Sequence, residues 1–209
     1  MTQLRGPLSR RDRQQQTREA LIFAAREVFA EDGYHAASLD RIAREAGFSK
    51  GAVYSNFDGK SALFLAVMDQ NLELAGADSR NPFEQPTNPA STGMELAERE
   101  GYPLQATQGF ALATLEFIAS AARDEALAPQ LHQRLTAVLG RYDAIAQEAR
   151  PDGETLAVSD VGKLLAALDQ GAGLLLLAGD LMPDAAVFNA GMRRLVDPAR
   201  AVTEGDPEA

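Results

Sequence analysis

The segment FSKGAVYSNFDGK, residues 48–60, predicts a short helix that packs on one side only. Ser49 can cap the start of this helix, and the Asp-Gly pair that follows it can turn the chain. Val53 and Phe57 share a helical face and would point inward. The residues left for the outer faces are small or polar, which packing alone does not require: Lys50, Gly51, Ala52, Tyr54, Ser55 and Asn56.

Two further helices precede this segment. Apolar residues in 21–29 recur at i, i+3, i+4, i+7 and i+8, which indicates an amphipathic helix from about Asp12 to just before EDGY, residues 31–34, with Gly33 as its stop signal. Ser38 and Gly47 bound a second, short helix. Two short helices joined by a tight turn and braced by a preceding helix are typical of a helix-turn-helix, whose second helix enters the major groove of DNA.

The rest of the chain predicts more helices and no strand. A fourth helix runs to about residue 75, where a segment with three closely spaced prolines, 76–93, ends it. Four helical patterns follow, and no apolar pattern has a period of two. We therefore predict an all-α protein with three parts: a basic arm and helix-turn-helix DNA-binding domain over 1–60, a connecting helix over about 58–75, and a helical ligand-binding and dimerisation body over 76–209 with an acidic, frayed tail from about 198.

Composition limits the chemistry that can be expected. The chain has no cysteine, so thiolate sites and disulfides are excluded, and its two histidines, His35 and His132, lie far apart in sequence. The N-terminal segment has no apolar signal region, and the longest apolar run is too short to span a membrane. We expect a soluble, cytoplasmic protein.

Charge is divided unevenly along the chain. The formal net charge is −10, but residues 1–60 hold ten basic and eight acidic side chains, whereas residues 61–209 hold ten and twenty-two. The excess acid therefore lies outside the segment that is expected to bind DNA. The segment that leads into the first helix is basic and suited to bind phosphates; its arginines are Arg5, Arg10, Arg11, Arg13 and Arg18. The alternative is a solvated arm that has no partner.

We expect the outer side chains of the third helix to meet DNA. Small residues such as Gly51 would let the backbone approach the groove floor, and Asn56 could pair with a base edge. Tyr54, Ser38 and Lys60 are suited to sugar and phosphate contacts. Caps, helix packing or a half-buried ring are the structural alternatives for single residues. The candidate DNA-binding residues are Ser38, Arg41, Ser49, Lys50, Gly51, Ala52, Tyr54, Ser55, Asn56 and Lys60.

The spacing F-x-x-x-G-Y-x-x-x-S-L-x-x-I-A-x-x-A-G-x-S-K-G-x-x-Y-x-x-F-x-x-K-x-x-L is satisfied from Phe29 to Leu63. In this segment the chain closely resembles the DNA-binding head of the TetR family of one-component bacterial transcription regulators. The resemblance implies an all-helical homodimer that reads two half-sites, a small-molecule site in the body, and a dimer interface made by the last two long helices. Asp40 departs from some relatives, which carry a basic residue there; it could repel a phosphate or pair with Arg44.

The body offers two sets of candidates. Residues 164–182 predict an apolar helix whose interior glycines each cost about 1 kcal/mol against Ala, which close packing across a two-fold axis would offset. The candidate dimer residues are Leu168, Gly171, Leu175, Leu176, Val187, Phe188, Met192 and Leu195. The candidate ligand residues, for which ordinary core is the alternative, are Met68, Leu72, Phe110, Thr114, Phe117, Leu135, Leu139, Tyr142 and Gln170.

We predict a DNA-binding transcriptional regulator, a repressor that binds a palindromic double-stranded operator as a homodimer and is released by an unknown small-molecule effector. The alternative is a DNA-binding regulator or architectural protein whose body binds protein partners and no inducer. An all-helical enzyme is a third hypothesis, but the sequence has no nucleophile elbow, metal cluster or P-loop. We therefore predict no enzymatic activity, no cofactor, no metal and no membrane partner.

Overall fold

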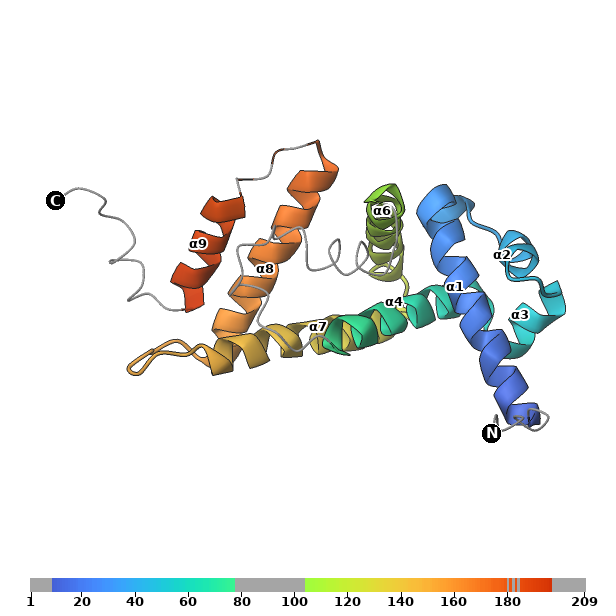
Figure 1. The fold of residues 1–209 in the computed structure, drawn as a ribbon, viewed down its shortest axis with the longest axis horizontal. Helices are drawn as coiled ribbons and strands as arrows, with labels where there is room; N and C mark the ends of the chain where they lie inside the picture. Colours follow the sequence, from blue (N-terminus) through green and yellow to red (C-terminus); the bar gives the residue numbers. More distant parts are fainter. Residues whose placement is uncertain (1–8, 78–103, 180, 182, 184, 197–209) are drawn as a thin grey trace, which may run out of the picture. The chain divides into compact units, whose positions relative to one another are not determined.

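The computed structural model describes residues 9–77, 104–179, 181, 183 and 185–196. All regular secondary structure in these residues is helical, as the sequence predicts (Figure 1). The helices are α1 (Arg10–Ala36), α2 (Leu39–Glu45), α3 (Lys50–Asn56), α4 (Gly59–Ala77), α6 (Leu104–Ala121), α7 (Ala128–Glu148), α8 (Val158–Leu177) and α9 (Ala185–Val196).

The chain divides into two compact units. The head unit comprises residues 1–71 and 105–128, and its described part contains α1, α2, α3, most of α4 and nearly all of α6. The body unit comprises residues 72–104 and 129–209 and contains α7, α8 and α9. The sequence analysis placed the helix at 104–121 in the body, whereas the structure groups it with the head.

The first helix begins with a reciprocal cap and is kinked near its end. The Ser9 hydroxyl accepts a hydrogen bond from the backbone N–H of Asp12, and the Asp12 carboxylate accepts one from the backbone N–H of Ser9. Gly33 has φ +76°, a region that residues with a side chain adopt at a cost. The expected stop at Gly33 is therefore a kink, after which α1 continues to Ala36.

Aromatic rings form the core of the head unit. The ring of Phe64 in α4 lies 4.8 Å from that of Phe29, 5.2 Å from that of Tyr34 and 4.6 Å from that of Phe117, measured between centroids. Phe29, Phe64 and Phe117 are fully buried. Because Phe117 belongs to α6, this cluster explains why α6 packs with the head.

Two contacts fix α6 directly on α1. A Cβ atom on Gly109 would lie 2.0 Å from the carbonyl oxygen of Ala30, so only glycine allows the two helices to approach this closely. Seven residues further along α6, the Glu116 carboxylate accepts a hydrogen bond from the backbone N–H of His35 at 3.1 Å. It also fills the space beside Gly33, where an added Cβ would lie 2.8 Å from a Glu116 oxygen.

The body unit has its own core, built between α7, α8 and α9. Gly162 of α8 lies against Asp143 of α7, since a Cβ there would be 2.9 Å from the Asp143 backbone nitrogen. The buried residues of this core are Ala146, Val161, Leu165, Ala172, Phe188, Met192 and Val196.

Candidate nucleic-acid interface

A tight turn joins α2 to α3. The side chain of Ser38 caps α2, and that of Ser49 caps α3 by accepting a hydrogen bond from the backbone N–H of the third residue beyond. Gly47, with φ +74°, makes the turn, and the backbone N–H of Phe48 donates to the carbonyl of Ala43 at 2.8 Å. The two short helices and their caps lie where the sequence predicts them.

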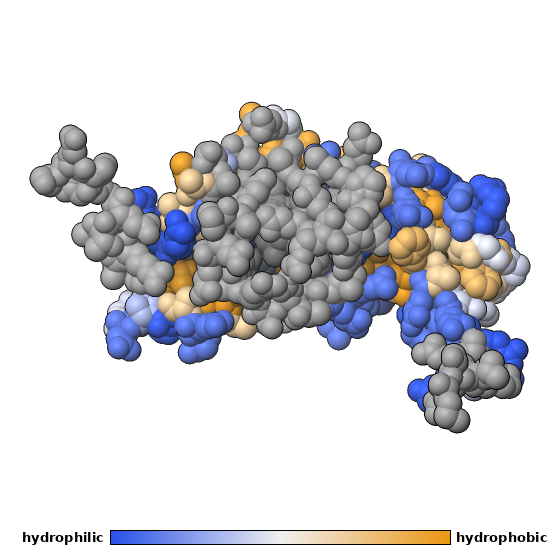
Figure 2. Space-filling model, in the orientation of Figure 1, coloured by the Kyte–Doolittle hydropathy of each residue, from blue (hydrophilic) through white to orange (hydrophobic). Residues whose placement is uncertain are grey.

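The inner sides of α2 and α3 pack against α1, as Figure 1 shows. Ile42 and Val53 are fully buried, and Phe57 is almost so. The opposite side of α3 is exposed to solvent, and we call it the outer face of α3: Lys50, Gly51, Tyr54 and Ser55. In Figure 2 the visible surface of the head unit is mostly hydrophilic, with a weakly apolar patch over α2 and α3.

Gly51 has no packing role that the described residues explain. A Cβ atom added to it would meet only the Ser49 hydroxyl, at an ordinary contact distance of 3.7 Å. Tyr54, one turn further on, is 57% exposed, which rules out the half-buried core ring. The outer face of α3 therefore combines an exposed backbone with an exposed ring.

Arg18 supports α3 from α1. Its guanidinium donates a hydrogen bond to the carbonyl of Asn56 at 2.9 Å, at the C-terminal end of α3, and lies 4.3 Å from the centroid of the Phe57 ring. Cations at a helix C-terminus are favourable because unpaired carbonyls gather there. Arg18 therefore positions α3 in the free protein, and its phosphate contact stays a prediction.

Arg41 also differs from its expected role as a DNA contact. Its guanidinium donates to the carboxylates of Glu31 and Asp32 in α1, and its Nε lies 3.9 Å from a carboxylate oxygen of Glu45. The hydrogen bonds that Arg41 donates to Asp32 and Glu31 raise the pKa of Arg41. Arg41 therefore braces α2 against α1, a role that helical periodicity does not reveal because the carboxylates belong to another helix.

Lys60 is engaged by the protein backbone. Its Nζ donates to the carbonyls of His35 at 2.8 Å and Ala37 at 3.1 Å, and lies 4.9 Å from the centroid of the Tyr34 ring. Burial lowers the pKa of Lys60, and the charge of Glu116 opposes this effect. Lys60 therefore caps the C-terminal end of α1 in the free protein, and its phosphate contact stays a prediction.

Asn56 and Ser55 turn their polar atoms back onto their own helix. The Asn56 amide nitrogen donates to the carbonyl of Ala52 at 2.8 Å, and the Ser55 hydroxyl donates to the same carbonyl at 2.9 Å. The Asn56 nitrogen also lies 3.3 Å from the Ser55 oxygen. In the free protein the Asn56 amide is thus held by its own helix, and its base contact stays a prediction.

Lys50 pairs with Asp40 across the turn. Nζ of Lys50 donates to Oδ2 of Asp40 at 2.9 Å, and both side chains are more than half exposed. The hydrogen bond that Lys50 donates to Asp40 raises the pKa of Lys50. Asp40 therefore pairs with Lys50 and not with Arg44, the partner suggested by the sequence.

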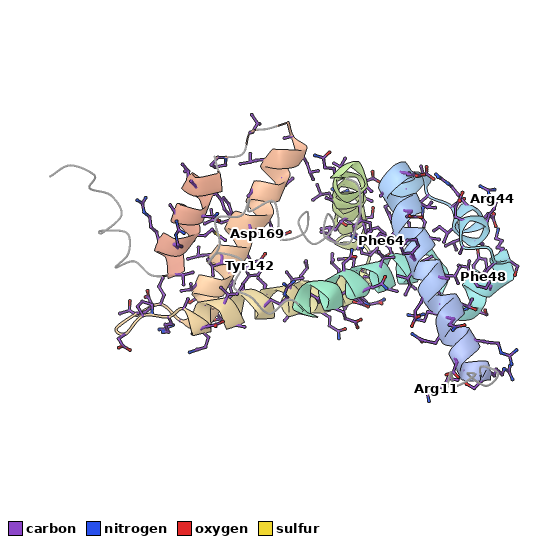
Figure 3. All side chains as sticks on the ribbon, in the orientation of Figure 1. Arg11, Arg44, Phe48, Phe64, Tyr142 and Asp169 are labelled. Carbon is purple, nitrogen blue, oxygen red and sulfur yellow. The ribbon has the colours of Figure 1, made fainter. Side chains whose placement is uncertain are left out.

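Four exposed arginines of the head unit have no ion-pair partner among the described residues: Arg10, Arg11, Arg13 and Arg44. The first three lie in the first turn and a half of α1, and Arg44 lies in the last turn of α2. Arg11 and Arg44 are labelled in Figure 3, where α2 and α3 lie between them. Positive charge thus flanks the outer face of α3.

A half-buried polar pair lies between α7 and α8 in the body unit. The Tyr142 hydroxyl donates to Oδ2 of Asp169 at 2.5 Å, and the Gln170 amide donates to the same oxygen at 3.4 Å (Figure 3). Burial is the main reason that the pKa values of Tyr142 and Asp169 are both raised. Sequence reasoning missed Asp169, because one acidic residue in an amphipathic helix gives no signal of burial.

The candidate ligand residues are divided between the two units. Phe117 is fully buried in the aromatic core of the head, and Phe110 stacks on Phe64 with ring centroids 5.5 Å apart. Leu135 and Gln170 are exposed. These placements favour the core alternative for the two phenylalanines and leave the following candidates half-buried: Met68, Leu72, Thr114, Leu139 and Tyr142.

The candidate dimer residues also separate into two groups. Phe188 and Met192 are buried in the core of their own body unit, and Leu195 packs against it, which corrects their assignment to a surface. Apolar residues lie on two faces of α9, and the periodicity of the sequence does not show which face points inward. Leu168, Leu175 and Val187 are exposed, Gly171 is half-buried, and the side chain of Leu176 lies outside the described residues.

Two absences hold for the described part of the chain. No helix there is both long and apolar enough to cross a membrane. No group of three or more His, Cys, Asp or Glu side chains there could hold a metal ion.

Residues 21–67 match the family described as "Bacterial regulatory proteins, tetR family". The HTH-type transcriptional regulator UidR of Escherichia coli K12 is 41% identical over 70 residues, which cover 34% of this chain and 36% of UidR. This chain therefore matches about a third of the length of that relative.

Two solved structures are similar over most of the chain. FadR of Bacillus subtilis, solved in complex with stearoyl-CoA, is similar with a TM-score of 0.61 and 22% sequence identity. The aligned region covers 86% of this chain and 97% of FadR. The fatty acid degradation regulator FadR of Bacillus halodurans has a TM-score of 0.60 at 20% identity and covers 93% of this chain and 97% of that one. At these identities the similarity shows a shared fold.

Proposed function

The chain is a TetR family protein by the match of its N-terminal helix-turn-helix segment, and on this premise we propose that it is a DNA-binding transcriptional repressor. It binds a palindromic operator as a homodimer, with one α3 in the major groove at each half-site. A two-fold dimer requires an inverted repeat, with its half-sites about 34 Å apart or a multiple of that distance.

The observation that carries this proposal is the outer face of α3. Glycine inside a helix costs about 1 kcal/mol against Ala, and nothing in the described chain requires it at position 51. A DNA groove that approaches the backbone at Gly51 would supply the missing reason. Tyr54, exposed beside it, offers a ring to a sugar and a hydroxyl to a phosphate.

The phosphate contacts of this proposal come from the unpaired arginines. Arg11 and Arg44 lie on opposite sides of α2 and α3 in Figure 3, and Arg10 and Arg13 are close to Arg11 at the start of α1. Arg41 and Lys60 serve as supports, since protein groups already hold their charges. Phosphate contacts fix the position of a protein on DNA without reading sequence.

An exposed apolar stripe on α8 supports the homodimer. Leu164, Leu168, Gly171 and Leu175 follow one another at intervals of four, three and four residues, and the three leucines are 42–45% exposed. Nothing in the described chain lies within 4 Å of a Cβ added to Gly171. A helix from a second copy would bury the stripe and use the small residue for close approach.

The effector of this proposal binds in the body and changes the distance between the two heads. A ligand does this only when its affinity differs between the conformation that fits the operator and the one that does not. The half-buried Tyr142–Asp169 pair is a polar group of the body that can orient such a ligand. FadR of Bacillus subtilis was solved with stearoyl-CoA, and acyl-CoA thioesters therefore belong in the first set of compounds to test.

The test is an in vitro selection of random duplex DNA with the full-length protein. The proposal predicts an enriched inverted repeat that is bound by two protomers. If the protein is folded and enriches no sequence, the proposal is wrong. An effector is then sought as a compound that both raises the melting temperature of the protein and lowers its affinity for the selected duplex.

A further inference from the structure

The ion pair between Asp40 and Lys50 lies at the reading surface of the head. Asp40 is in the first turn of α2, and Lys50 is the first residue of α3, next to Gly51. The two side chains are 61% and 54% exposed. The pair thus joins the two short helices at the end of α3 whose residues contact base edges in helix-turn-helix proteins.

A carboxylate at a DNA surface has few partners there. Phosphates repel it, and in the major groove it can accept hydrogen bonds only from the amino groups of cytosine and adenine. Oδ2 of Asp40 already accepts from Lys50, while Oδ1 has no hydrogen-bond partner among the described residues. One oxygen therefore remains for a base.

The ammonium group of Lys50 has the complementary chemistry. It uses one of its three N–H donors on Asp40, and lysine donates preferentially to O6 and N7 of guanine. A C·G base pair presents the cytosine amino group beside guanine O6, so a carboxylate and an ammonium group side by side match its major-groove edge. In an A·T pair the carboxylate could accept from the adenine amino group. Lysine would then find one acceptor on thymine, O4, where guanine offers two, O6 and N7.

Building on the proposed function, we propose that Asp40 and Lys50 together read one C·G base pair in each half-site, with Asp40 accepting from the cytosine amino group and Lys50 donating to guanine. Arg41, the neighbour of Asp40 in α2, is held by Glu31 and Asp32. Lys50 is therefore the basic residue that pairs with Asp40. The exposed ion pair contributes roughly 0–1 kcal/mol to folding, and the position of Asp40 in the first turn of α2 contributes a similar amount through the helix dipole.

The experiment compares base preferences of the full-length wild type with those of Asp40→Ala in the same in vitro selection. We expect wild-type half-sites to contain one C·G pair that is favoured by about tenfold or more over other pairs. In Asp40→Ala that preference should fall below about threefold while the remaining positions keep theirs. Titrations of two duplexes that differ only in that base pair give the fold-changes directly.

Two further variants make the comparison specific. Glu45→Gln removes another exposed carboxylate from α2, one that lies 3.9 Å from Arg41 and is not paired with Lys50. It should retain the C·G preference. Asp40→Asn keeps the size of the side chain and should also lose preference at the same position, so the test stands if Asp40→Ala folds poorly.

Three outcomes would overturn the inference. If Asp40→Ala changes the affinity for all duplexes by the same factor, Asp40 affects binding only through its charge and does not read a base pair. An unchanged base preference would remove it from recognition, and an Asp40-dependent preference for A·T would contradict the base assignment. Each of these leaves the enriched inverted repeat intact, whereas failure of the proposed function is the absence of any repeat with folded wild-type protein.

Discussion

Replacing Gly51 by Ala should stabilise the free protein and weaken its binding to DNA. Gly51 is not among the glycines with positive φ, and an added Cβ meets only the Ser49 hydroxyl at 3.7 Å. Removing a helical glycine should therefore raise the free energy of unfolding by about 0.5–1 kcal/mol, which corresponds to a rise in melting temperature of about 1–4 °C for a chain of this size.

The same methyl group would stand between the α3 backbone and the groove floor. Forcing a methyl group into a close-packed contact costs about 1–3 kcal/mol, which is about 5- to 150-fold in affinity. The matched control is Gly140→Ala: Gly140 lies inside α7, nothing is within 4 Å of an added Cβ, and it belongs to the body unit.

The assays are thermal unfolding and fluorescence-anisotropy titration of the selected duplex with both variants. Both alanines should raise the melting temperature, and only Gly51→Ala should lower the affinity for DNA. A Gly51→Ala protein that is stabilised and binds DNA as tightly as the wild type would refute the reasoning, because the backbone would then have no close partner at this position.

Three further results are expected. Lys60→Ala should lower the free energy of unfolding by about 1–3 kcal/mol, because two backbone carbonyls lose a charged donor. The control is Lys163→Ala, which should change the melting temperature little, since Lys163 is exposed and, among the described residues, pairs only with Asp160. Asp169→Asn should remove a pH dependence: burial raises the pKa of the folded carboxyl, so wild-type stability from this group is present below its unfolded pKa and is lost as pH rises through the folded pKa. The melting temperature of the wild type minus that of the variant should accordingly fall with rising pH, and a constant difference would contradict the raised pKa of Asp169. Leu168→Glu should shift the protein from dimer to monomer in light scattering, while Leu156→Glu, also exposed but outside the stripe, should not.

Local signals made the helices of the head predictable. Ser38, Ser49 and Gly47 act over three or four residues, and each lies in the structure where the sequence places it. The same is true of Val53 and Phe57, whose spacing indicates the inner side of α3. Caps, turns and helical faces are set by near neighbours, so a single sequence carries enough information about them.

The roles of charged side chains were not predictable in the same way. Arg18, Arg41 and Lys60 were all suited to phosphates by type, yet each is held by groups 9 to 38 residues away in the chain. Their partners are backbone carbonyls or carboxylates of another helix, which become neighbours only after the helices pack. The sequence therefore shows where positive charges are, and the fold determines which groups they contact.

The placement of α6 has a similar cause. Its apolar stripe predicts a helix but does not say which unit buries it. Gly109 against Ala30 and Phe117 in the aromatic cluster decide the question through contacts between distant segments. In α9, likewise, the choice of Phe188 and Met192 as the inner face depends on where α8 lies.

The central claim is that α3 reads an inverted repeat as part of a dimer, and one titration tests it most directly. The selected duplex and a duplex with one half-site scrambled are bound by the wild-type protein at several salt concentrations. The account predicts two protomers on the intact repeat, weaker binding to the scrambled duplex, and an affinity that falls by about 10³-fold or more between 50 and 200 mM salt. Equal binding to both duplexes, or an affinity that salt does not change, would contradict it.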